Sequence, residues 1–209
     1  MENVNGNSLA KLIVFEGIDG CGKSTQAELL TKFIIRKGYK CELVCEKWGN
    51  KFIESQANLL NEDLSPITKA LLFNAIRIEH TKNVLLPAMM NNDFVIMDRR
   101  ELSTFVYQGV IDRIEISKLF SLHNLNPIGI VADYIFLINV SHIVANERLK
   151  VRDNEVVDKW TLSTSTCYDV FSPYINTINI DGEKSKHIVH KKIVNLFYDL
   201  FGDKLNESF

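Results

Sequence analysis

The sequence has little that would place it in a membrane or on a nucleic acid. None of the apolar runs in its 209 residues approaches about 20 residues, the length that a membrane-spanning helix needs. The formal net charge of −2 gives no electrostatic case for binding DNA or RNA. The first ten residues are polar and lack a basic stretch followed by an apolar one. We therefore expect a disordered tail over residues 1–10 rather than a signal peptide.

Cysteine is also scarce, with four residues: Cys21, Cys41, Cys45 and Cys167. Cys41 and Cys45 fall on one expected strand, where four residues at about 3.3 Å each separate them by about 13 Å. That distance is too long for a disulfide bond. We therefore expect no disulfide framework and a reducing, cytoplasmic compartment. The five histidines form no group with metal-ligand spacing.

Strand and helix signals alternate along the chain, and this alternation predicts a parallel sheet with helices on both faces. A hydrophobic content of 46% and a charged content of 24% are ordinary for one globular domain of this length. The expected strands cover residues 11–16, 41–45, 94–97, 134–138 and 175–180. The expected helices cover about 22–37, 52–60, 66–86 (with Pro87 kinking or ending it), 103–109, 113–122, a charged stretch capped by Ser141, a stretch ending near 171, and 184–201.

A glycine-rich stretch follows the first expected strand and leads into the first expected helix. It runs from Gly17 to Thr25 with the sequence GIDGCGKST, and its strand–turn–helix context makes it a phosphate-binding P-loop. Its glycines allow positive φ, and its N–H groups cradle phosphates. Lys23 is expected to reach the β- and γ-phosphates, and Ser24 to help hold Mg²⁺. The expected ATP-binding residues are Gly17, Gly20, Cys21, Gly22, Lys23, Ser24 and Thr25.

The apolar strand expected at residues 94–97 is followed directly by Asp98. A strand that delivers a carboxylate to the carboxyl edge of a parallel sheet has the form of a Walker-B strand. There the carboxylate would bind Mg²⁺ directly or through water, although an aspartate in this place is also a common helix cap. Together with the P-loop, Asp98 predicts the P-loop NTPase fold, a three-layer α/β/α sandwich with a five-stranded parallel sheet. Ser24 and Asp98 are the expected metal ligands.

Three blocks together make the chain resemble the thymidylate kinases. They are residues Phe15–Thr25, Leu71–Arg77 and Asp98–Gly109, and their order and spacing cover the chain from the first strand to Gly109. The resemblance implies an enzyme that transfers the γ-phosphate of ATP to dTMP with Mg²⁺, commonly as a homodimer. The sequence has no repeat, low-complexity tract or linker, so we expect one kinase domain over residues 11–209, and the resemblance implies a short lid at about 146–159.

The resemblance gives three residues a role near the sugar and base of the acceptor nucleotide. Asp19 would lie near the sugar 3′-hydroxyl, Phe73 would stack on the thymine ring, and Arg77 would reach the exocyclic oxygen of the base. Phe73 and Arg77 are i,i+4 neighbours on one helix face, so both can line one pocket. The alternative for Phe73 is an ordinary core position.

Four more residues acquire roles in the same site from the resemblance. Arg99 would bind the acceptor phosphate and bridge to the donor, because a guanidinium group suits bidentate contact with phosphate. Thr104 would read the edge of the base. Tyr107 would leave no room for a ribose 2′-hydroxyl, and Gln108 would line the same pocket.

An arginine is also expected to reach the transferring phosphate. Some thymidylate kinases carry a basic residue inside the P-loop, where this chain has Gly20, and others supply the arginine from a lid. Arg148 and Arg152 lie in the lid region on one helix face, and the sequence does not separate them. A solvated charged helix is the alternative. The expected catalytic residues are Lys23, Arg99, Arg148 and Arg152.

The chain departs from the family pattern in places that concern the base preference more than the reaction. The family usually carries Arg-Glu-Pro-Gly-Gly, or a Phe-Pro variant, after the second strand. Here the sequence is Cys45-Glu46-Lys47-Trp48-Gly49-Asn50, in which Lys47 could replace the missing arginine. Arg100 stands where an aromatic residue or histidine is usual, and Asp158-Lys159 matches the lid pattern only in part.

Two other functions stay open at this point. One is a kinase of another (deoxy)nucleoside monophosphate or of an analogue on the same fold, and the other is a non-catalytic nucleotide-binding protein. A GTPase switch would need Asn-Lys-x-Asp, and the stretch Asn50–Ile53 lacks the acid. A pseudoenzyme would typically have lost Lys23 or Asp98, and both are present. Because Cys21 lies in the P-loop, a thiol reagent is a candidate inhibitor.

Overall fold

The computed structural model describes residues 9–46, 53–55, 59, 63–153, 168 and 176–206, without the side chains of 152–153 and 203–206. Several sequence predictions therefore lie wholly or mostly outside the described residues. They are the tail at 1–10, the helix at 52–60, the helix ending near 171, Lys47, Trp48, Gly49, Asn50, Asp158, Lys159 and Cys167.

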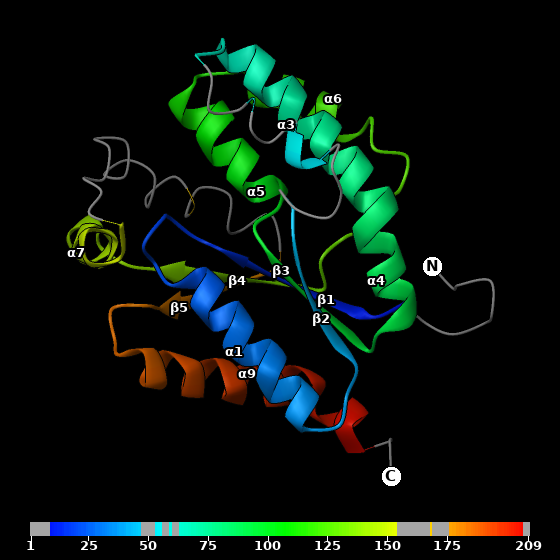
Figure 1. The fold of residues 1–209 in the computed structure, drawn as a ribbon, viewed down its shortest axis with the longest axis vertical. Helices are drawn as coiled ribbons and strands as arrows, with labels where there is room; N and C mark the ends of the chain where they lie inside the picture. The colour runs from blue at the N-terminus through cyan, green and yellow to red at the C-terminus, as the bar shows by residue number, and fades with distance from the viewer. Residues whose placement is uncertain are drawn as a thin grey trace.

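The centre of the fold is a sheet of five parallel strands, as the sequence predicts. The strands lie in the order β2-β3-β1-β4-β5 (Figure 1). Parallel neighbours need a crossover of a dozen or more residues, and each crossover here contains at least one helix. The strands are β1 (Lys11–Glu16), β2 (Cys41–Cys45), β3 (Phe94–Asp98), β4 (Tyr134–Asn139) and β5 (Thr177–Asp181).

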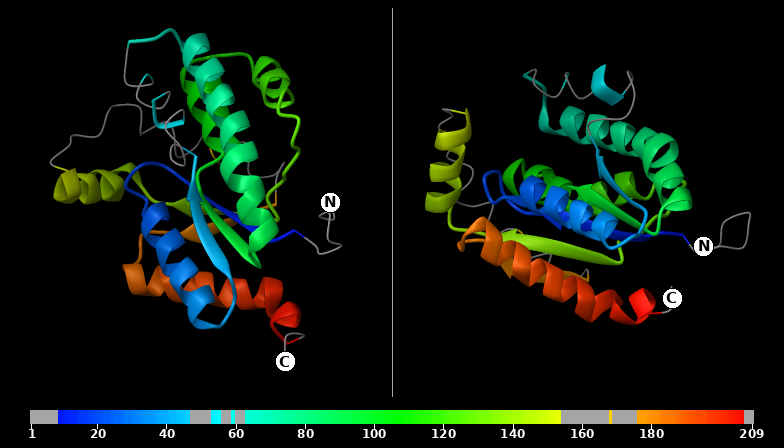
Figure 2. Two further views of the ribbon diagram at one scale, coloured as in Figure 1. Left: turned by 45° about the vertical axis from the view of Figure 1, so that its right-hand side comes forward. Right: turned by 60° about the horizontal axis from the view of Figure 1, so that its bottom comes forward.

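Helices cover both faces of this sheet and give the molecule three layers (Figures 1 and 2). Helices α1 and α9 lie side by side on one face, and α3, α4, α5 and α6 lie on the other. Helix α7 lies beside the glycine-rich loop that follows β1. The helices are α1 (Lys23–Arg36), α3 (Pro66–His80), α4 (Leu86–Asn91), α5 (Glu101–Thr104), α6 (Ile116–His123), α7 (His142–Asp153) and α9 (Lys186–Asn206), with π-helical turns η1 (Thr81–Leu85) and η2 (Phe105–Ile111).

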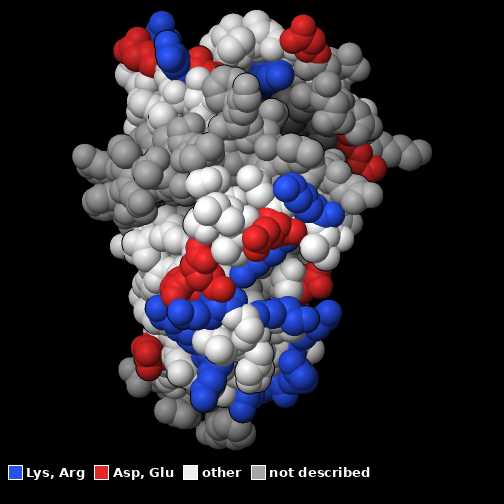
Figure 3. Space-filling model, turned by 90° about the vertical axis from the view of Figure 1, so that its left-hand side faces the viewer, with Lys and Arg blue, Asp and Glu red and all other residues white. Residues whose placement is uncertain are grey.

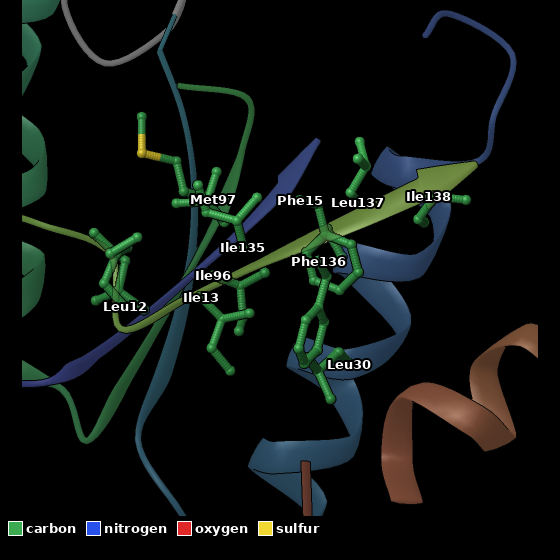
Figure 4. Close-up of a cluster of buried hydrophobic side chains, with 14 of the residues drawn as sticks. Leu12, Ile13, Phe15, Leu30, Ile96, Met97, Ile135, Phe136, Leu137 and Ile138 are labelled. Carbon is green, nitrogen blue, oxygen red and sulfur yellow. The ribbon is translucent and has the colours of Figure 1, made fainter. Parts of the chain in front are cut away.

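The main apolar core lies between the sheet and these helices. Side chains of β1, β3 and β4 pack together there with Leu30 of α1 (Figure 4). Phe15 and Phe136 are fully buried, and their rings meet edge to face with 5.4 Å between centroids, a favourable arrangement for aromatic pairs. The continuous apolar runs of these strands follow from burial on both faces of a parallel sheet.

The helical run that begins at Pro66 does not end at Pro87. It continues through η1 and α4 to Asn91. A proline lacks the N–H group that an interior helical residue donates. The π-helical turn just before Pro87 changes the backbone hydrogen bonds, because the N–H of Leu86 donates to the carbonyl of Thr81, five residues earlier. Pro87 then stands in the first turn of α4. A proline is tolerated in a first turn.

Helix boundaries after β3 also differ from the prediction. Residues 101–111 form α5 and then the π-helical η2, and the next helix begins at Ile116 rather than near Arg113. Arg113 has a left-handed backbone with φ of 59°, which a continuing α-helix does not allow. The predicted cap at Ser141 is confirmed, since its hydroxyl accepts the N–H of Val144 at 3.4 Å.

Three neighbouring strands end at the same level of the sheet. Phe15 of β1 and Cys45 of β2 are both in register with Asp98, the last residue of β3. Glu16 and Glu46, which come next in the chain, therefore emerge at one edge. In open α/β sheets, ligands bind in the crevice outside the carboxyl ends of the strands.

Candidate active site

The glycine-rich loop after β1 has the backbone of a phosphate cradle. Gly17, Gly20 and Gly22 have φ of 140°, 81° and 97°, and α1 begins directly after Gly22. The first N–H groups of a helix lack intrahelical partners, and the helix dipole favours negative charge there. This loop and the start of α1 together are therefore suited to bind phosphate groups.

Gly20 lies directly against helix α7. A Cβ atom at this position would lie 2.4 Å from the carbonyl oxygen of Ala145 and 3.0 Å from Cγ of Leu149. No real Cβ approaches backbone so closely. The helix can therefore reach the loop only because residue 20 has no side chain, which explains why no basic residue stands in this part of the loop.

A cluster of three charged side chains lies at the mouth of the loop. Asp19 Oδ1 accepts hydrogen bonds from Lys23 Nζ at 3.0 Å and from Arg99 Nη2 at 2.6 Å. Burial alone would raise the pKa of Asp19, but the two cations hold that pKa well below its usual range. Asp19 is therefore ionised at neutral pH and keeps both cations close to the loop.

A cavity of about 370 Å³ opens at the carboxyl edge beside this cluster. It joins residues from the glycine-rich loop, from α3, and from the segment that follows β3. Of the residues predicted from the sequence, those that line it are Asp19, Lys23, Ser24, Phe73, Arg77, Asp98, Arg99, Thr104, Tyr107 and Gln108. Phe73 is only partly buried and faces this cavity, which argues against the alternative of a core position.

The deep part of this cavity holds a buried ion pair. The guanidinium group of Arg77 donates to both carboxylate oxygens of Glu46, with Nη2 3.1 Å from Oε2, and to the hydroxyl of Thr104 at 2.8 Å. Burial alone would lower the pKa of Arg77, but the nearby carboxylates, Glu46 first among them, raise it overall. Arg77 is therefore fixed from two sides, and its direction is set by Glu46 and Thr104.

Arg99 has an unusual backbone for a residue with a side chain. Its φ of 67° lies in the left-handed region, which is costly for a residue other than glycine. The guanidinium group lies 5.6 Å from the centre of the Tyr107 ring, a cation–π distance. Such strain is kept only where neighbouring groups hold it.

Asp98 and Ser24 line the same cavity, as expected for residues that hold a metal. Asp98 Oδ1 is buried and has no hydrogen-bond partner among the described residues. No group of three or more His, Cys, Asp or Glu side chains in the described ranges could hold a metal. Mg²⁺ is commonly bound through one or two protein carboxylates plus substrate phosphates and water, so an unpartnered carboxylate oxygen in a cavity that Ser24 also lines fits this ion.

A second cavity, of about 360 Å³, lies on the other side of the loop and is lined by Cys21, Gly22, Thr25 and Arg148. Arg148 of α7 donates to the carbonyl of Cys21 at 3.2 Å and to that of Gly182 at 2.8 Å. Many Lys and Arg side chains gather on this face of the molecule (Figure 3). The side chain of Arg152 lies outside the described part of the chain.

Three comparisons with known proteins agree on one family. The family model described as thymidylate kinase matches residues 15–193. The chain belongs to the thymidylate kinase family. A thymidylate kinase of Caldicellulosiruptor saccharolyticus is 32% identical over 199 residues, which are 91% of this chain and 97% of that protein. One from Neorickettsia sennetsu is 39% identical over 127 residues, 60% of this chain and 64% of that protein.

A solved structure supports the same assignment. The crystal structure of thymidylate kinase from Ehrlichia chaffeensis superposes with a TM-score of 0.70 and 30% sequence identity, covering 90% of this chain and 98% of that one. The P-loop NTPase fold predicted from the sequence is thus confirmed, and family membership makes the chain a kinase. None of the helices in the described residues is long and apolar enough to cross a membrane.

Three features of this family member change the sequence-based interpretation. Glu46 is in the family pattern, but the sequence did not reveal its pairing with Arg77, which is 31 positions away. Arg100 is buried and lines the cavity of about 370 Å³, where its Nη2 donates to the carbonyl of Ile130 at 2.6 Å and its Nε lies 2.8 Å from Glu101. The Cys21 thiol is 2% exposed, and burial raises its pKa. This argues against alkylation of Cys21 as a route to inhibition.

Replacement of Gly20 tests the contact between the loop and α7. Gly20→Ala should lower the melting temperature and raise the KM for ATP, because the new methyl group displaces α7 and Arg148. Gly38→Ala is the matched control. Its φ is 92°, but nothing lies within 4 Å of a Cβ there, so it should cost only about 1–2 kcal/mol of backbone strain and leave both KM values unchanged. Equal changes in melting temperature and in the KM for ATP for the two variants would contradict a close contact between Gly20 and α7.

Glu46→Gln tests whether Glu46 fixes Arg77. We expect the KM for dTMP to rise about tenfold, which corresponds to about 1.4 kcal/mol, while the KM for ATP stays the same. The physical reason is that glutamine leaves a buried guanidinium without its counter-charge. Glu79→Gln is the control, because Glu79 lies on α3, the helix that carries Arg77, and accepts a hydrogen bond from the Asn83 side chain at the surface. An unchanged KM for dTMP in a folded Glu46→Gln protein would show that Glu46 does not set the acceptor site.

Proposed function

We propose that the two cavities are the acceptor and donor sites of a single phosphoryl transfer. As a member of the thymidylate kinase family, the chain transfers the γ-phosphate of ATP to dTMP. The observation that carries the proposal is the position of the P-loop between the cavities. Lys23 and Ser24 line one cavity, and Gly22 and Thr25 line the other, so a phosphate chain held by the loop can present its end to the acceptor site.

The acceptor nucleotide would bind in the cavity of about 370 Å³. Phe73 offers a ring on which a base can stack, and stacking contributes about 1–3 kcal/mol per base. Arg77 and Thr104 offer polar groups to the base edge, and Gln108 lines the same wall. In this arrangement Tyr107 lies beside the sugar and excludes a ribose 2′-hydroxyl. Support for these roles comes from the shared cavity and from the family blocks.

Charge stabilisation would come from the cations at the mouth of the loop. Phosphoryl transfer is mostly a matter of positioning and of balancing charge on the transferring group. Lys23 would contact the phosphates of the donor, and Arg99 would contact the acceptor phosphate and bridge to the donor. Asp19, which holds both cations, would then accept a hydrogen bond from the sugar 3′-hydroxyl.

Mg²⁺ would be held by the Asp98 carboxylate and the Ser24 hydroxyl, directly or through water. Support comes from the orphaned, buried Asp98 Oδ1 and from its place in the cavity that Ser24 also lines. When bound, the ion neutralises charge on the donor phosphates.

The two candidate lid arginines would have different tasks. Arg148 donates to carbonyl groups of Cys21 and Gly182 and lines the second cavity, so we assign it to donor binding. Arg152, one helical turn further along α7, is then the better candidate for the transferring phosphate. We further propose one kinase domain over residues 11–209 with a lid at about 146–159.

We also propose that the protein is a homodimer of the cytoplasm and does not bind nucleic acid. Ile67 and Leu71 are 45% and 50% exposed one turn apart on α3, and a second copy could cover them. Cys21, Cys41 and Cys45 form no disulfide bond, which is compatible with a reducing compartment. Cell fractionation would check the location.

The reaction is tested with an assay that couples ADP release to NADH oxidation, using dTMP, dUMP, dCMP, dGMP, dAMP and UMP as acceptors. We expect the highest kcat/KM for dTMP, poor turnover of UMP, and none without Mg²⁺. Tyr107→Ala should raise the ratio of kcat/KM for UMP to kcat/KM for dUMP about tenfold, because the smaller side chain makes room for the 2′-hydroxyl.

Other results of this assay have clear meanings. A preference for another monophosphate would keep the kinase and discard the thymine pocket. Absence of turnover with every acceptor, in a protein that still binds ATP, would indicate a nucleotide-binding protein without activity.

The dimer is tested by sedimentation equilibrium. We expect the mass of two chains for the unmodified protein and a shift towards one chain for Leu71→Asp, since a charge in a closely packed apolar interface is costly. Val131→Asp is the control, because Val131 is 75% exposed and lies before β4. One chain's mass for the unmodified protein would contradict the homodimer.

A further inference from the structure

Glu16 is a buried carboxylate to which the reaction, as described so far, gives no task. It is the last residue of β1 and has 0% of its surface exposed. An acidic residue is rarely buried completely unless it is paired. It lies between the glycine-rich loop that follows it and the segment that follows β3, at the level of the acceptor cavity.

The carboxylate of Glu16 binds the segment around Arg99 at three points. Oε1 accepts the backbone N–H of Arg100 at 2.8 Å and that of Ser103 at 3.3 Å, and Oε2 accepts the hydroxyl of Ser103 at 2.6 Å. All three partners donate. An ionised carboxylate is an acceptor at both oxygens, so this environment matches the charged form of Glu16.

The same contacts hold Arg99 at both ends. Its backbone is in the left-handed region and is held by two hydrogen bonds. The N–H of Arg99 donates to the carbonyl of Phe15 at 3.0 Å, and the N–H of the next residue, Arg100, donates to Glu16. Its guanidinium Nη1 donates to Ser103 Oγ at 2.8 Å, and this hydroxyl in turn donates to Glu16. Glu16 therefore determines both the backbone turn at Arg99 and the hydroxyl on which the guanidinium rests.

The buried Tyr168 joins the same network. Its hydroxyl lies 3.0 Å from Ser103 Oγ and 3.2 Å from Arg99 Nη1. Burial raises the pKa of Glu16, and the nearby Arg99 guanidinium and the hydrogen bonds from Ser103 and Arg100 oppose that rise. The pKa of Glu16 stays raised overall, so the hydrogen-bond geometry is what carries its action on Arg99.

We propose that Glu16 is a positioning residue for phosphoryl transfer, which fixes the left-handed turn and the guanidinium of Arg99 so that Arg99 faces the acceptor phosphate. The inference rests on the proposed role of Arg99. Glu16 itself has no contact with a nucleotide in this assignment. Its effect on the reaction must therefore pass through Arg99.

A double-mutant cycle tests this route. Glu16→Gln keeps the size of the side chain but replaces one accepting oxygen with an NH₂ group and removes the charge. We expect it to lower kcat/KM for dTMP by about 10- to 100-fold, the cost of a misplaced reacting group, with no change in KM for ATP. In an Arg99→Ala background, the same substitution should change kcat/KM less than about twofold, because the route is already broken.

A merely structural role gives a different result. In that case the two substitutions would act independently, and their effects on kcat/KM would multiply, which would overturn the proposal. Asp133→Asn is the matched control. Asp133 accepts the N–H of Leu12 at 2.9 Å and pairs with Lys11 at the opposite edge of the sheet, so its loss should lower the melting temperature and leave the kinetic constants unchanged.

Three further outcomes each have a defined meaning. If Glu16→Gln does not fold, Ser103→Ala takes its place in the cycle with Arg99→Ala, and multiplying effects again overturn the proposal. If Arg99→Ala alone leaves kcat/KM for dTMP unchanged, the proposed role of Arg99 fails and the task of Glu16 fails with it. If Arg99→Ala is impaired but the effects multiply, the role of Arg99 stands and only the positioning role of Glu16 is lost.

Discussion

Two cations, Lys23 and Arg99, meet on one carboxylate oxygen, Asp19 Oδ1, at 3.0 and 2.6 Å. A phosphate-binding site must collect positive charge before any phosphate arrives, and like charges this close repel one another. A carboxylate placed inside the loop removes that repulsion and keeps the cations aimed at the same point. The glycine-rich backbone, the strand ends and the turn at Arg99 all contribute by bringing these three side chains together.

Much of this architecture could be predicted because its signals are local. The P-loop is a continuous stretch between a strand and a helix, and Asp98 ends an apolar strand, so both could be placed at one edge of a parallel sheet. The five strands were predicted within a few residues for the same reason. Helix ends were harder to predict. A proline is expected to kink or end a helix, but the π-helical turn before Pro87 shifts the backbone hydrogen bonds so that the helical run continues past it.

The partners of the predicted residues could not be read from the sequence. Arg77 and Glu46 are separated by 31 positions, and Arg99 and Glu16 by more than 80. The pairing of β1 with β3 brings the second pair together, and the packing of α3 over the end of β2 brings the first pair together. The sequence also left Arg148 and Arg152 equivalent. The close contact of α7 with Gly20 directs Arg148 to the carbonyl of Cys21, and our proposal of a donor-binding role for Arg148 rests on this contact. Side chains that hold other side chains need tertiary structure to be recognised.

The two cavities share a wall that is only a few residues thick. Lys23 and Ser24 line one of them, while their neighbours Gly22 and Thr25 line the other. A single molecule with two linked heads could therefore occupy both at once, bridging over the loop. Binding of the first head would hold the second at a high effective concentration, so the affinity of the linked compound would far exceed that of either half. The thin wall makes this kinase a natural target for bisubstrate inhibitors.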